Sequence, residues 1–223
     1  MKLLEVKQGY RLIVSLGFSC APAINLKRYG LRKFSMPLDW MISYSLTDVN
    51  RLLRSRFQQF MEFRNLHKLD ETDFLLDDGD PVYLDNLRSD LSHAYFIKDA
   101  SYNIISVHDF PVIPGQDWTA GYPAYRLKLE RRTRRFWSQL MSSSDTLFVR
   151  WFADADQVRE LQLILTALLK NKNFTILILN PVPGLSTTRE VEWGIQNVCV
   201  LEVSPDLNDY ANWDYILQGI SLY

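Results

Sequence analysis

The sequence predicts an α/β fold: a three-layer, open, mostly parallel sheet with flanking helices and a partly helical insertion. Four short segments are nearly continuous in Val, Ile, Leu and Phe, which is typical of parallel strands covered on both faces. These segments are 11–16, 146–152, 174–179 and 197–203. Helical patterns separate or follow them, as in open α/β sheets with right-handed crossovers. An apolar content of 47% is enough for a large core.

The N-terminal half contains predicted elements of both kinds. The first strand stops at Gly17, and a helix follows from Ala21 to Tyr29-Gly30. An amphipathic helix is predicted over 47–63, with Thr47 or Asp48 as its cap. The later elements are an acidic loop over 70–81, one or two strands within 94–110, a loop over 111–123 and a helix over 126–141.

Two further helices are predicted towards the C-terminus. Apolar residues recur at helical spacing over 156–170, with Asp154 or Asp156 as the N-cap, and a last helix covers 209–220. No internal repeat, low-complexity segment or linker is evident. We therefore expect one α/β domain over 1–223, with an irregular helical and loop insertion around 45–125.

Composition argues against several classes of protein. The formal charge of −1 and the pI near 6.3 create no general attraction to nucleic acid or membranes. Two cysteines are too few for a disulfide framework, and a single Cys20–Cys199 bridge has weak support, so reduced thiols and a cytoplasmic location are expected. We find no signal peptide, membrane span, P-loop, GxGxxG, CxxC pair or HExxH motif, and expect neither cofactor nor metal. The oligomeric state is not predicted.

Cys20 is the first candidate for a catalytic residue. It follows an apolar strand and a tight turn at Gly17, and it precedes the helix that opens at Ala21. The helix dipole and the unpaired N–H groups of the first turn favour thiolate over thiol. Cysteine becomes a nucleophile in such a setting. The N–H groups around Ser19 to Ala21 are candidates for stabilising an oxyanion.

A thiol nucleophile needs a base, and the chain has three histidines. His108 stands at the end of a predicted strand, whereas His67 and His93 lie in polar stretches typical of the surface. We pair Cys20 with His108, although a partly buried histidine bonded to the backbone is an alternative. The group that would orient the imidazole is left open among Asp39, Asp109 and Asn180.

Other polar residues are expected near the same sheet edge, since ligands bind beyond the carboxyl ends of strands in open α/β sheets. Arg150 lies inside an apolar strand and needs a carboxylate, phosphate or carbonyl partner, so ligand binding and a structural ion pair are both open. Asp39 is favoured as a site residue, while Trp40 also suits a core position and Asn180 a turn. The predicted substrate-binding residues are Gly17, Ser19, Trp40, Asp109, Arg150 and Asn180.

Two charged segments have simpler interpretations. Lys128, Arg131, Arg132 and Arg135 share one helix face, which a solvated surface explains better than a patch for phosphate or an acidic glycan. The acidic run 77–80 lacks the spacing and terminal glutamate of an EF-hand, so calcium binding is discounted.

Several segments resemble a bacterial family described as papain-like cysteine peptidases. They are 15–20, 30–35, 37–40, His108-Asp109-Phe110, the 131–136 stretch and Phe148-Val149-Arg150. The resemblance spans nearly the whole chain and implies a catalytic cysteine at Cys20 and a histidine at His108. It also implies a cysteine on a helix that faces a separate antiparallel β domain carrying the histidine.

Two hypotheses about function follow from these residues. In the first, Cys20 attacks a carbonyl in a hydrolase or acyltransferase reaction, His108 transfers the proton and Arg150 anchors an anionic part of the substrate. In the second, the chain is a non-catalytic or sugar- and glycan-processing α/β domain that binds an anionic ligand through Arg150 and Asp39. Cys20 would then be a small buried packing residue. The accessibility of the thiol distinguishes them; an interaction module using the aromatic loop 118–125 is a weaker third option.

Overall fold

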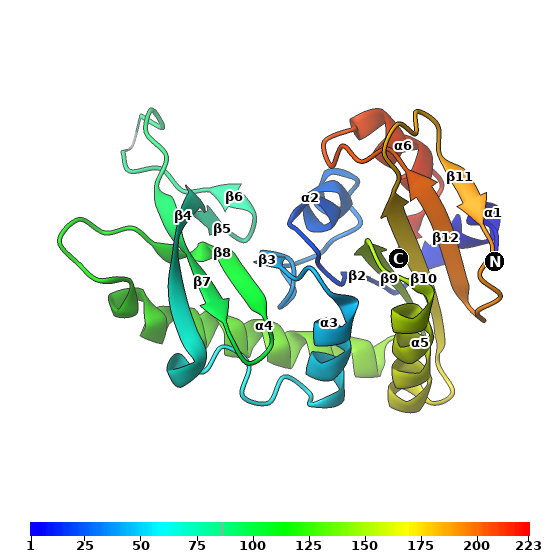
Figure 1. The fold of residues 1–223 in the computed structure, drawn as a ribbon, viewed down its shortest axis with the longest axis horizontal. Coiled ribbons are helices and arrows are strands. Elements are labelled where there is room, and N and C mark those ends of the chain that lie inside the picture. The colour runs from blue at the N-terminus through cyan, green and yellow to red at the C-terminus, as the bar shows by residue number, and fades with distance from the viewer. Residues whose placement is uncertain (86) are drawn as a thin grey trace.

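A computed structural model describes residues 1–85 and 87–223 of the chain. Its five-stranded sheet has the strand order β11-β12-β10-β9-β2 (Figure 1). Four of these strands run parallel and β11, at one edge, runs antiparallel. The strands are β2 (Leu12–Ser15), β9 (Asp145–Trp151), β10 (Asn173–Pro181), β11 (Arg189–Val191) and β12 (Val198–Val203).

Alternate residues of this sheet enter two separate cores, because successive side chains of a strand point to opposite faces. In β10, Ile176 and Ile178 join one core and Leu177 and Leu179 the other. Helices α3 (Leu46–Arg54) and α5 (Ala155–Leu169) contribute to the first core. Helices α1 (Leu3–Val6), α2 (Ala21–Arg28) and α6 (Tyr210–Leu217) contribute to the second. Because both of their faces are covered, β2, β9, β10 and β12 are mostly apolar, whereas the edge strand β11 is exposed and mostly charged.

A second sheet has four antiparallel strands in the order β3-β8-β7-β4. They are β3 (Met41–Ile42), β4 (Leu66–Phe74), β7 (His93–Asp99) and β8 (Ile104–Pro111). A small hairpin of β5 (Leu76–Asp77) and β6 (Asp80–Pro81) follows β4, and β1 (Gly9–Tyr10) pairs with β13 (Ser221–Leu222). Single 3₁₀ turns lie at η1 (Phe63–Asn65) and η2 (Trp118–Gly121).

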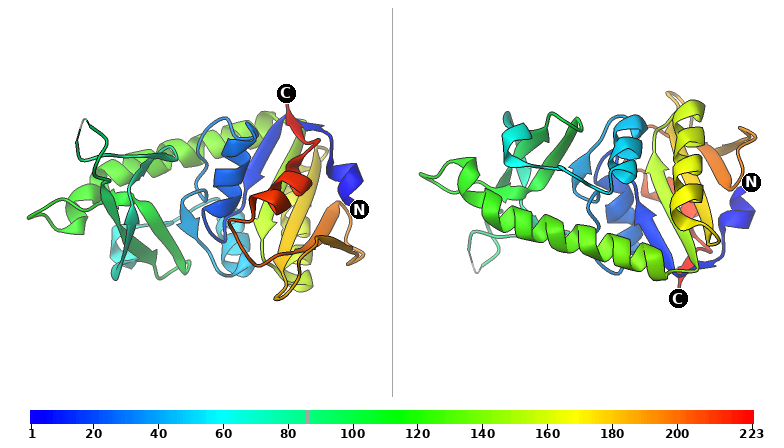
Figure 2. Two further views of the ribbon diagram at one scale, coloured as in Figure 1. Left: turned by 90° about the horizontal axis from the view of Figure 1, so that it is seen from above. Right: turned by 90° about the horizontal axis from the view of Figure 1, so that it is seen from below.

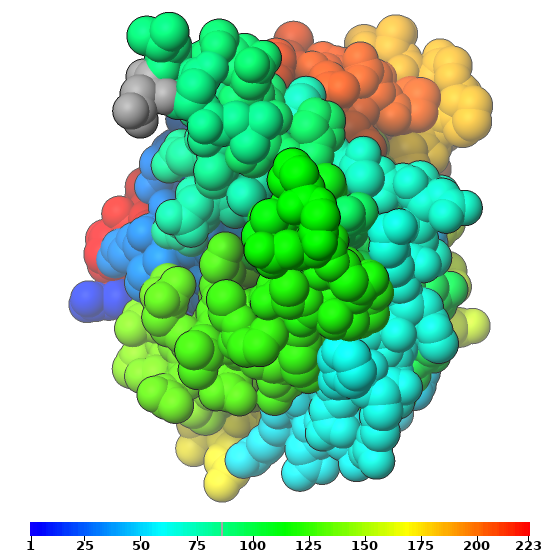
Figure 3. Space-filling model, turned by 90° about the vertical axis from the view of Figure 1, so that its left-hand side faces the viewer, coloured from blue at the N-terminus to red at the C-terminus, as the bar shows by residue number. Residues whose placement is uncertain are grey.

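Helix α4 (Tyr122–Ser142) runs along the molecule beneath both sheets (Figure 2). Its buried residues lie at helical spacing, with Tyr125 near the antiparallel sheet and Leu140 leading into β9. Helix α2 lies between the two sheets in Figure 1, so the segment after β2 faces the antiparallel strands. Figure 3 shows the end of the molecule that lies on the left in Figure 1, which is formed mainly by the cyan and green segments of the antiparallel half.

The antiparallel sheet has irregular strand pairing between β7 and β8 and between β4 and β7. Between the pairs Tyr95–Phe110 and Ile97–Ser106, β8 advances four residues while β7 advances two. Strand β4 has a similar irregularity between Lys68 and Thr72. Bulges of this kind re-aim side chains and are common beside active sites. His108 and Asp109 both lie within the irregular part of β8.

The mixed α/β class is confirmed, but one three-layer, mostly parallel sheet is not, because parallel and antiparallel sheets are both present. All four predicted parallel strands and the helix over 126–141 are found, and Asp154 caps α5. The 45–125 segment contributes most of an antiparallel sheet besides α3.

Three local predictions are wrong. The helix predicted over 47–63 is capped by Ser45 and ends at Arg54, because Arg56 and Phe57 adopt left-handed backbone conformations (φ 53° and 63°). The acidic loop over 70–81 is partly strand, in β4 and the β5–β6 hairpin. Arg132 is not solvated: it is 3% exposed and is ion-paired with Asp109.

Candidate active site

Cys20 sits at the end of a tightly bent turn. Strand β2 ends at Ser15, Gly17 and Phe18 then take left-handed conformations (φ 80° and 83°), and Cys20 is the N-cap residue of α2. A side chain on Gly17 would meet Ser43, since a Cβ there would lie 2.8 Å from Oγ. A left-handed backbone is costly for an aromatic residue such as Phe18 and needs support from its surroundings.

Arg150 stabilises this turn through hydrogen bonds to the residues beside it. Its Nη1 donates to the carbonyl of Leu16 at 2.9 Å and to Oγ of Ser43 at 2.8 Å, and its Nη2 donates to the carbonyl of Ser43 at 2.6 Å. Ser43 Oγ in turn accepts the N–H of Phe18 at 3.0 Å. Burial lowers the pKa of Arg150 to about 9, which leaves the guanidinium charged at neutral pH. Its partners are carbonyl and hydroxyl oxygens, and no part of it is exposed to a ligand.

Cys20 is half-buried, and its thiol lies in an acidic environment. Burial is the main cause of a raised thiol pKa, and the carboxylates of Asp73, Asp39 and Asp109 add to it. Asp73 and Asp109 belong to β4 and β8, so the thiol lies towards the antiparallel sheet. This result differs from the thiolate expected at a helix N-terminus. Both cysteines are free, and Cys199 is buried in β12.

His108 is held in a defined orientation. Its Nδ1 lies 2.7 Å from the carbonyl oxygen of Phe74, and its ring packs edge-on against Trp40 with 6.0 Å between centroids. A carbonyl only accepts hydrogen bonds, so Nδ1 carries the proton and Nε2 of the neutral ring has a free lone pair. No hydrogen bond joins Cys20 and His108 in the described part of the chain. The other two histidines, His67 and His93, are exposed as expected.

Asp39 belongs to a buried polar group beside Trp40. Its Oδ2 accepts the N–H of Met36 at 2.9 Å and lies 3.3 Å from Nη1 of Arg32, while Oδ1 has no partner among the described residues. Burial is the main cause of the rise in the pKa of Asp39 to about 6. Arg32 and the Trp40 indole N–H both donate to Oγ of Ser35, at 2.6 and 2.9 Å. Asp39 is therefore bonded within the protein.

None of the three proposed orienting groups bonds to His108. Asp109 instead pairs with Nη1 of Arg132 at 2.7 Å and lies 3.3 Å from Nζ of Lys128. Asn180 exchanges two hydrogen bonds of 3.0 Å with the backbone of Ala153, at the start of the β9–α5 connection. The orienting group is the carbonyl of Phe74, which gives no signal in the sequence because every residue carries one.

The hairpin β5–β6 was not expected to contribute to the site. Oδ1 of Asp78 accepts the N–H of Ser35 at 3.1 Å, and the Asp78 carbonyl accepts from Nη2 of Arg32 at 3.0 Å. Asp80 pairs with Lys27 of α2 at 2.5 Å. The run Asp77-Asp78-Gly79-Asp80 thus joins α2 and the Arg32 group to the antiparallel half. Its turn-forming Asp-Gly pair was the one sequence signal for a hairpin here.

Three aromatic side chains lie beside the turn that carries Cys20. Phe18 packs against Tyr44 and Phe152, with ring centroids 6.1 and 5.9 Å apart. Tyr44 and Phe152 are 58% and 46% exposed, so they form an accessible apolar surface next to the site. Ser19 Oγ accepts the N–H of Ala21 at 3.3 Å. No hydrogen-bond acceptor is found within residues 1–85 and 87–223 for the backbone N–H groups of Ser19 and Cys20.

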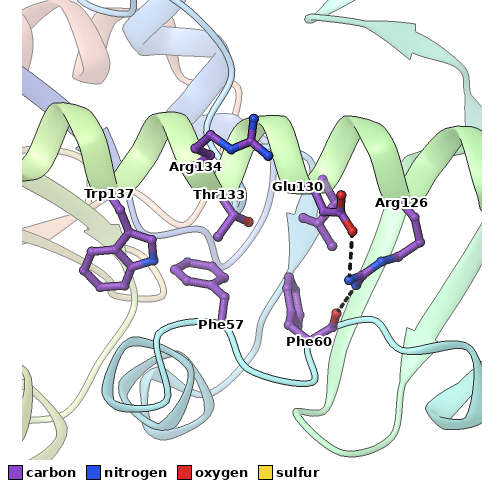
Figure 4. Close-up of a pocket in the computed structure, with 8 residues that line it drawn as sticks. Phe57, Phe60, Arg126, Glu130, Thr133, Arg134 and Trp137 are labelled. Atoms are coloured by element: carbon purple, nitrogen blue, oxygen red, sulfur yellow. Dashed lines mark hydrogen bonds and ion pairs between the residues drawn. The ribbon is translucent and has the colours of Figure 1, made fainter.

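A separate cavity of about 300 Å³ lies between α4 and the segment around Phe57 and Phe60 (Figure 4). Trp137 closes one end, and Arg126, bonded to Glu130 and to the carbonyl of Phe60, closes the other. It contains none of the residues selected from the sequence. No cluster of three or more His, Cys, Asp or Glu side chains suited to a metal ion occurs in the part of the chain that is described. No described helix is long and apolar enough to span a membrane.

The chain is similar to known sequences but not to known structures. The sequence profile of a family described as "Putative papain-like cysteine peptidase (DUF1796)" matches residues 11–182. An uncharacterised protein of Acanthamoeba polyphaga mimivirus is 29% identical over 186 residues, covering 76% of this chain and 78% of the viral protein. No solved structure matches. The matched span includes both Cys20 and His108.

Proposed function

Because the chain belongs to the family described as "Putative papain-like cysteine peptidase", we propose that it is a cysteine-nucleophile hydrolase acting on a peptide or related acyl substrate. Cys20 is the proposed nucleophile and His108 the proposed base. The family's sequence profile matches 172 of the 223 residues, from 11 to 182. The expectation that the family is bacterial is not confirmed, since the relative named above is viral.

Two local features of the structure support the proposal. One is a thiol at the N-cap of α2, beyond a turn with two left-handed residues. The other is an imidazole in an irregular strand, with its Nδ1 proton fixed by the Phe74 carbonyl. A cysteine on a helix that faces an antiparallel sheet carrying the histidine is also the arrangement implied by the resemblance to papain-like peptidases.

In the proposed reaction, Sγ of Cys20 forms a bond to the substrate carbonyl carbon while its proton passes to Nε2 of His108. The carbonyl π electrons move to the oxygen, which the N–H groups of Ser19 and Cys20 stabilise. His108 then returns the proton to the leaving group as the C–N or C–O bond breaks. Water hydrolyses the thioester by the same route. Because the thiol pKa is raised, deprotonation accompanies the attack and a thiolate is not stored beforehand.

Arg150 acts in this proposal as a positioning residue. Its guanidinium is buried and bonded to the backbone of the turn, so it does not anchor an anionic part of the substrate. The exposed rings of Tyr44 and Phe152, packed on Phe18, would contact an apolar part of the substrate.

The test is hydrolysis of a fluorogenic peptide library by the wild type, Cys20→Ser, His108→Ala and His93→Ala. His93 is an exposed histidine on the neighbouring strand and serves as the matched control. We expect wild type and His93→Ala to cleave a shared subset of peptides, and Cys20→Ser and His108→Ala to lose that cleavage while keeping their circular dichroism spectra. Equal activity of all four proteins would refute the Cys20–His108 pair.

A second candidate function is favoured by one observation, the raised pKa of Cys20. A half-buried, protonated thiol also suits a packing residue in a non-catalytic or sugar- and glycan-processing domain. If the wild type cleaves no peptide and Cys20→Ser is less stable than the wild type, this alternative is preferred. The anionic-ligand version through Arg150 and Asp39 lacks support, because both side chains are buried and bonded internally.

A further inference from the structure

A cavity of about 280 Å³ lies between the β5–β6 hairpin and the first turns of α4. Its volume suits a small ligand group and not a whole polymer. Most of its wall is apolar, formed by Leu75, Leu76, Val82, Pro111 and Ala124. The polar lining residues are Asp77, Asp109, Tyr125 and Lys128. Two of these side chains, Tyr125 and Asp109, have a buried oxygen without a hydrogen bond among the described residues.

The hydroxyl of Tyr125 is an unused hydrogen-bonding group. The side chain is 1% exposed, its ring packs on Phe110 at 4.2 Å between centroids, and its oxygen has no partner in the described chain. Burial, helped by the Asp109 carboxylate, raises its pKa, so the hydroxyl keeps its proton and can donate. Leaving such a group unpaired costs about 1–3 kcal/mol, and buried tyrosines usually find partners.

Oδ1 of Asp109 is an unused acceptor in the same wall. Its other oxygen accepts from Arg132 at 2.7 Å. Nζ of Lys128 lies 3.3 Å from Oδ1 and forms an ion pair with it, but no hydrogen bond. Arg132 and Lys128 together already neutralise the carboxylate, so the cavity has no spare charge for an ion. What it lacks is one acceptor for a hydroxyl and one donor for an oxygen.

We propose that this cavity binds an uncharged amide group. Its carbonyl oxygen would accept from Tyr125, its N–H would donate to Oδ1 of Asp109, and an aliphatic stem would lie along the leucine and valine side chains. Because Lys128 and Arg132 already neutralise Asp109, a carboxylate or an ammonium group would enter this mostly apolar cavity without a free counter-charge, so both ions are disfavoured. Glutamine or asparagine side chains and N-acetyl groups all carry this chemistry.

A role of the cavity in holding part of a substrate rests on the proposed function, whereas the binding of an amide group does not. Asp109 lines the cavity and also acts on the Cys20 thiol, which places the two sites close together. We infer that the amide belongs to a substrate residue near the bond that is cleaved. Both unpaired atoms lie just beneath the lining surface, so binding requires the hairpin to shift outward. The ion pairs of the hairpin to Lys27 and Lys128 resist this shift only weakly, whereas the hydrogen bonds of Asp78 to Ser35 and Arg32 have to lengthen or break.

The first experiment measures binding by saturation-transfer difference NMR in Cys20→Ala, so that turnover plays no part. The probes are butyramide, butyrate and butylamine, which match in size and differ in charge, and N-propylacetamide as a secondary amide. We expect butyramide to bind about tenfold more tightly than either ion, as one buried hydrogen bond allows. If butyramide binds more tightly than N-propylacetamide, the natural group is a primary amide side chain. If N-propylacetamide binds more tightly than butyramide, it is an N-acetyl group. Equal binding of amide and ions, or no amide binding, overturns the proposal.

Two variants test the assigned partners. Tyr125→Phe removes only the hydroxyl and should weaken amide binding about tenfold. Leu127→Ala, at an exposed position of the same helix, should bind like the parent protein. Unchanged binding in Tyr125→Phe contradicts the assignment even if the protein is an active peptidase.

The stability of Tyr125→Phe gives a second readout without ligand. If the hydroxyl is unpaired in the free protein, its removal leaves Tm unchanged or raises it. A lower Tm would mean that the hydroxyl already has a partner, and the argument from an unused donor would fail. Conversely, inactive wild-type protein with normal amide binding would refute the proposed function but not the amide site.

Discussion

Arg150 contacts Ser43 through two atoms, with Nη1 2.8 Å from Oγ and Nη2 2.6 Å from the carbonyl oxygen. Through this pair, a residue of the parallel sheet holds the segment that follows β3 of the antiparallel sheet. The same guanidinium donates to the carbonyl of Leu16, just before the Gly17–Phe18 turn. The position of Cys20 therefore depends on a buried cation whose partners are neutral oxygens.

We expect Arg150→Met to be strongly destabilised. Methionine fills much of the space but leaves the carbonyls of Leu16, Ser43 and Phe152 without donors, at about 1–3 kcal/mol each. Urea unfolding of Arg150→Met and of Arg159→Met, an exposed arginine on α5, measures the difference. The control should lose less than about 1 kcal/mol. A similar midpoint for both variants would show that the turn does not depend on Arg150.

The acidic surroundings of Cys20 predict an effect of Asp73. Because its carboxylate raises the thiol pKa, Asp73→Asn should increase the thiolate fraction and the rate of alkylation by iodoacetamide at pH 8. We expect an increase of roughly two- to tenfold, since tenfold corresponds to one pKa unit. Asp70→Asn, an exposed carboxylate on the same strand, is the control. Mass spectrometry separates Cys20 from the buried Cys199, and equal rates for both variants would contradict this view of the site.

Asp39 predicts a pH dependence of stability. Its pKa of about 6 in the native state exceeds the ordinary value of 3.8, so the native protein holds the proton more tightly than the unfolded chain. Its contribution to stability is therefore complete below about pH 4 and is lost as the pH rises through 6. Asp39→Asn removes the titrating carboxyl group and with it this pH dependence. The free energy of unfolding of the wild type relative to the variant should therefore fall by up to about 3 kcal/mol from pH 4 to pH 7. Urea unfolding at several pH values measures it; parallel curves for wild type and variant would exclude a raised pKa.

Parts of this arrangement could be predicted from the sequence because they depend on neighbouring residues. Continuous apolar runs identify β9, β10 and β12, since both faces of these strands are buried. The order of strand, glycine turn and helix places Cys20 at an N-cap. These features are local, and the structure confirms them.

Other parts depend on contacts between distant segments. The carbonyl that fixes His108 comes from Phe74, 34 residues away, and the partners of Arg150 come from positions up to 134 residues away. Backbone oxygens look the same at every position, so neither contact has a sequence signal. The antiparallel sheet was missed as a unit because the edge strand β4 is mostly polar and exposed, which resembles a loop in composition.

Gly79 makes the docking of the β5–β6 hairpin testable. Its φ is +90°, and a Cβ at this position would lie 2.7 Å from the Trp40 ring and 2.9 Å from Arg32. Gly115 also has a positive φ, +76°, but a Cβ there would meet nothing within 4 Å. Both alanine variants bear the cost of a left-handed backbone, about 1–2 kcal/mol, and only Gly79→Ala adds a collision with the group that holds Asp39.

We therefore expect Gly79→Ala to release the hairpin, while Gly115→Ala leaves it docked. Amide hydrogen exchange at residues 75–82 should accelerate in Gly79→Ala, because the hydrogen bonds of Asp78 to Ser35 and Arg32 are lost. The same variant should open the cavity beside Tyr125, whose outer wall is the hairpin. If exchange at 75–82 is equally slow in both variants, the hairpin is held by contacts other than those of its tip.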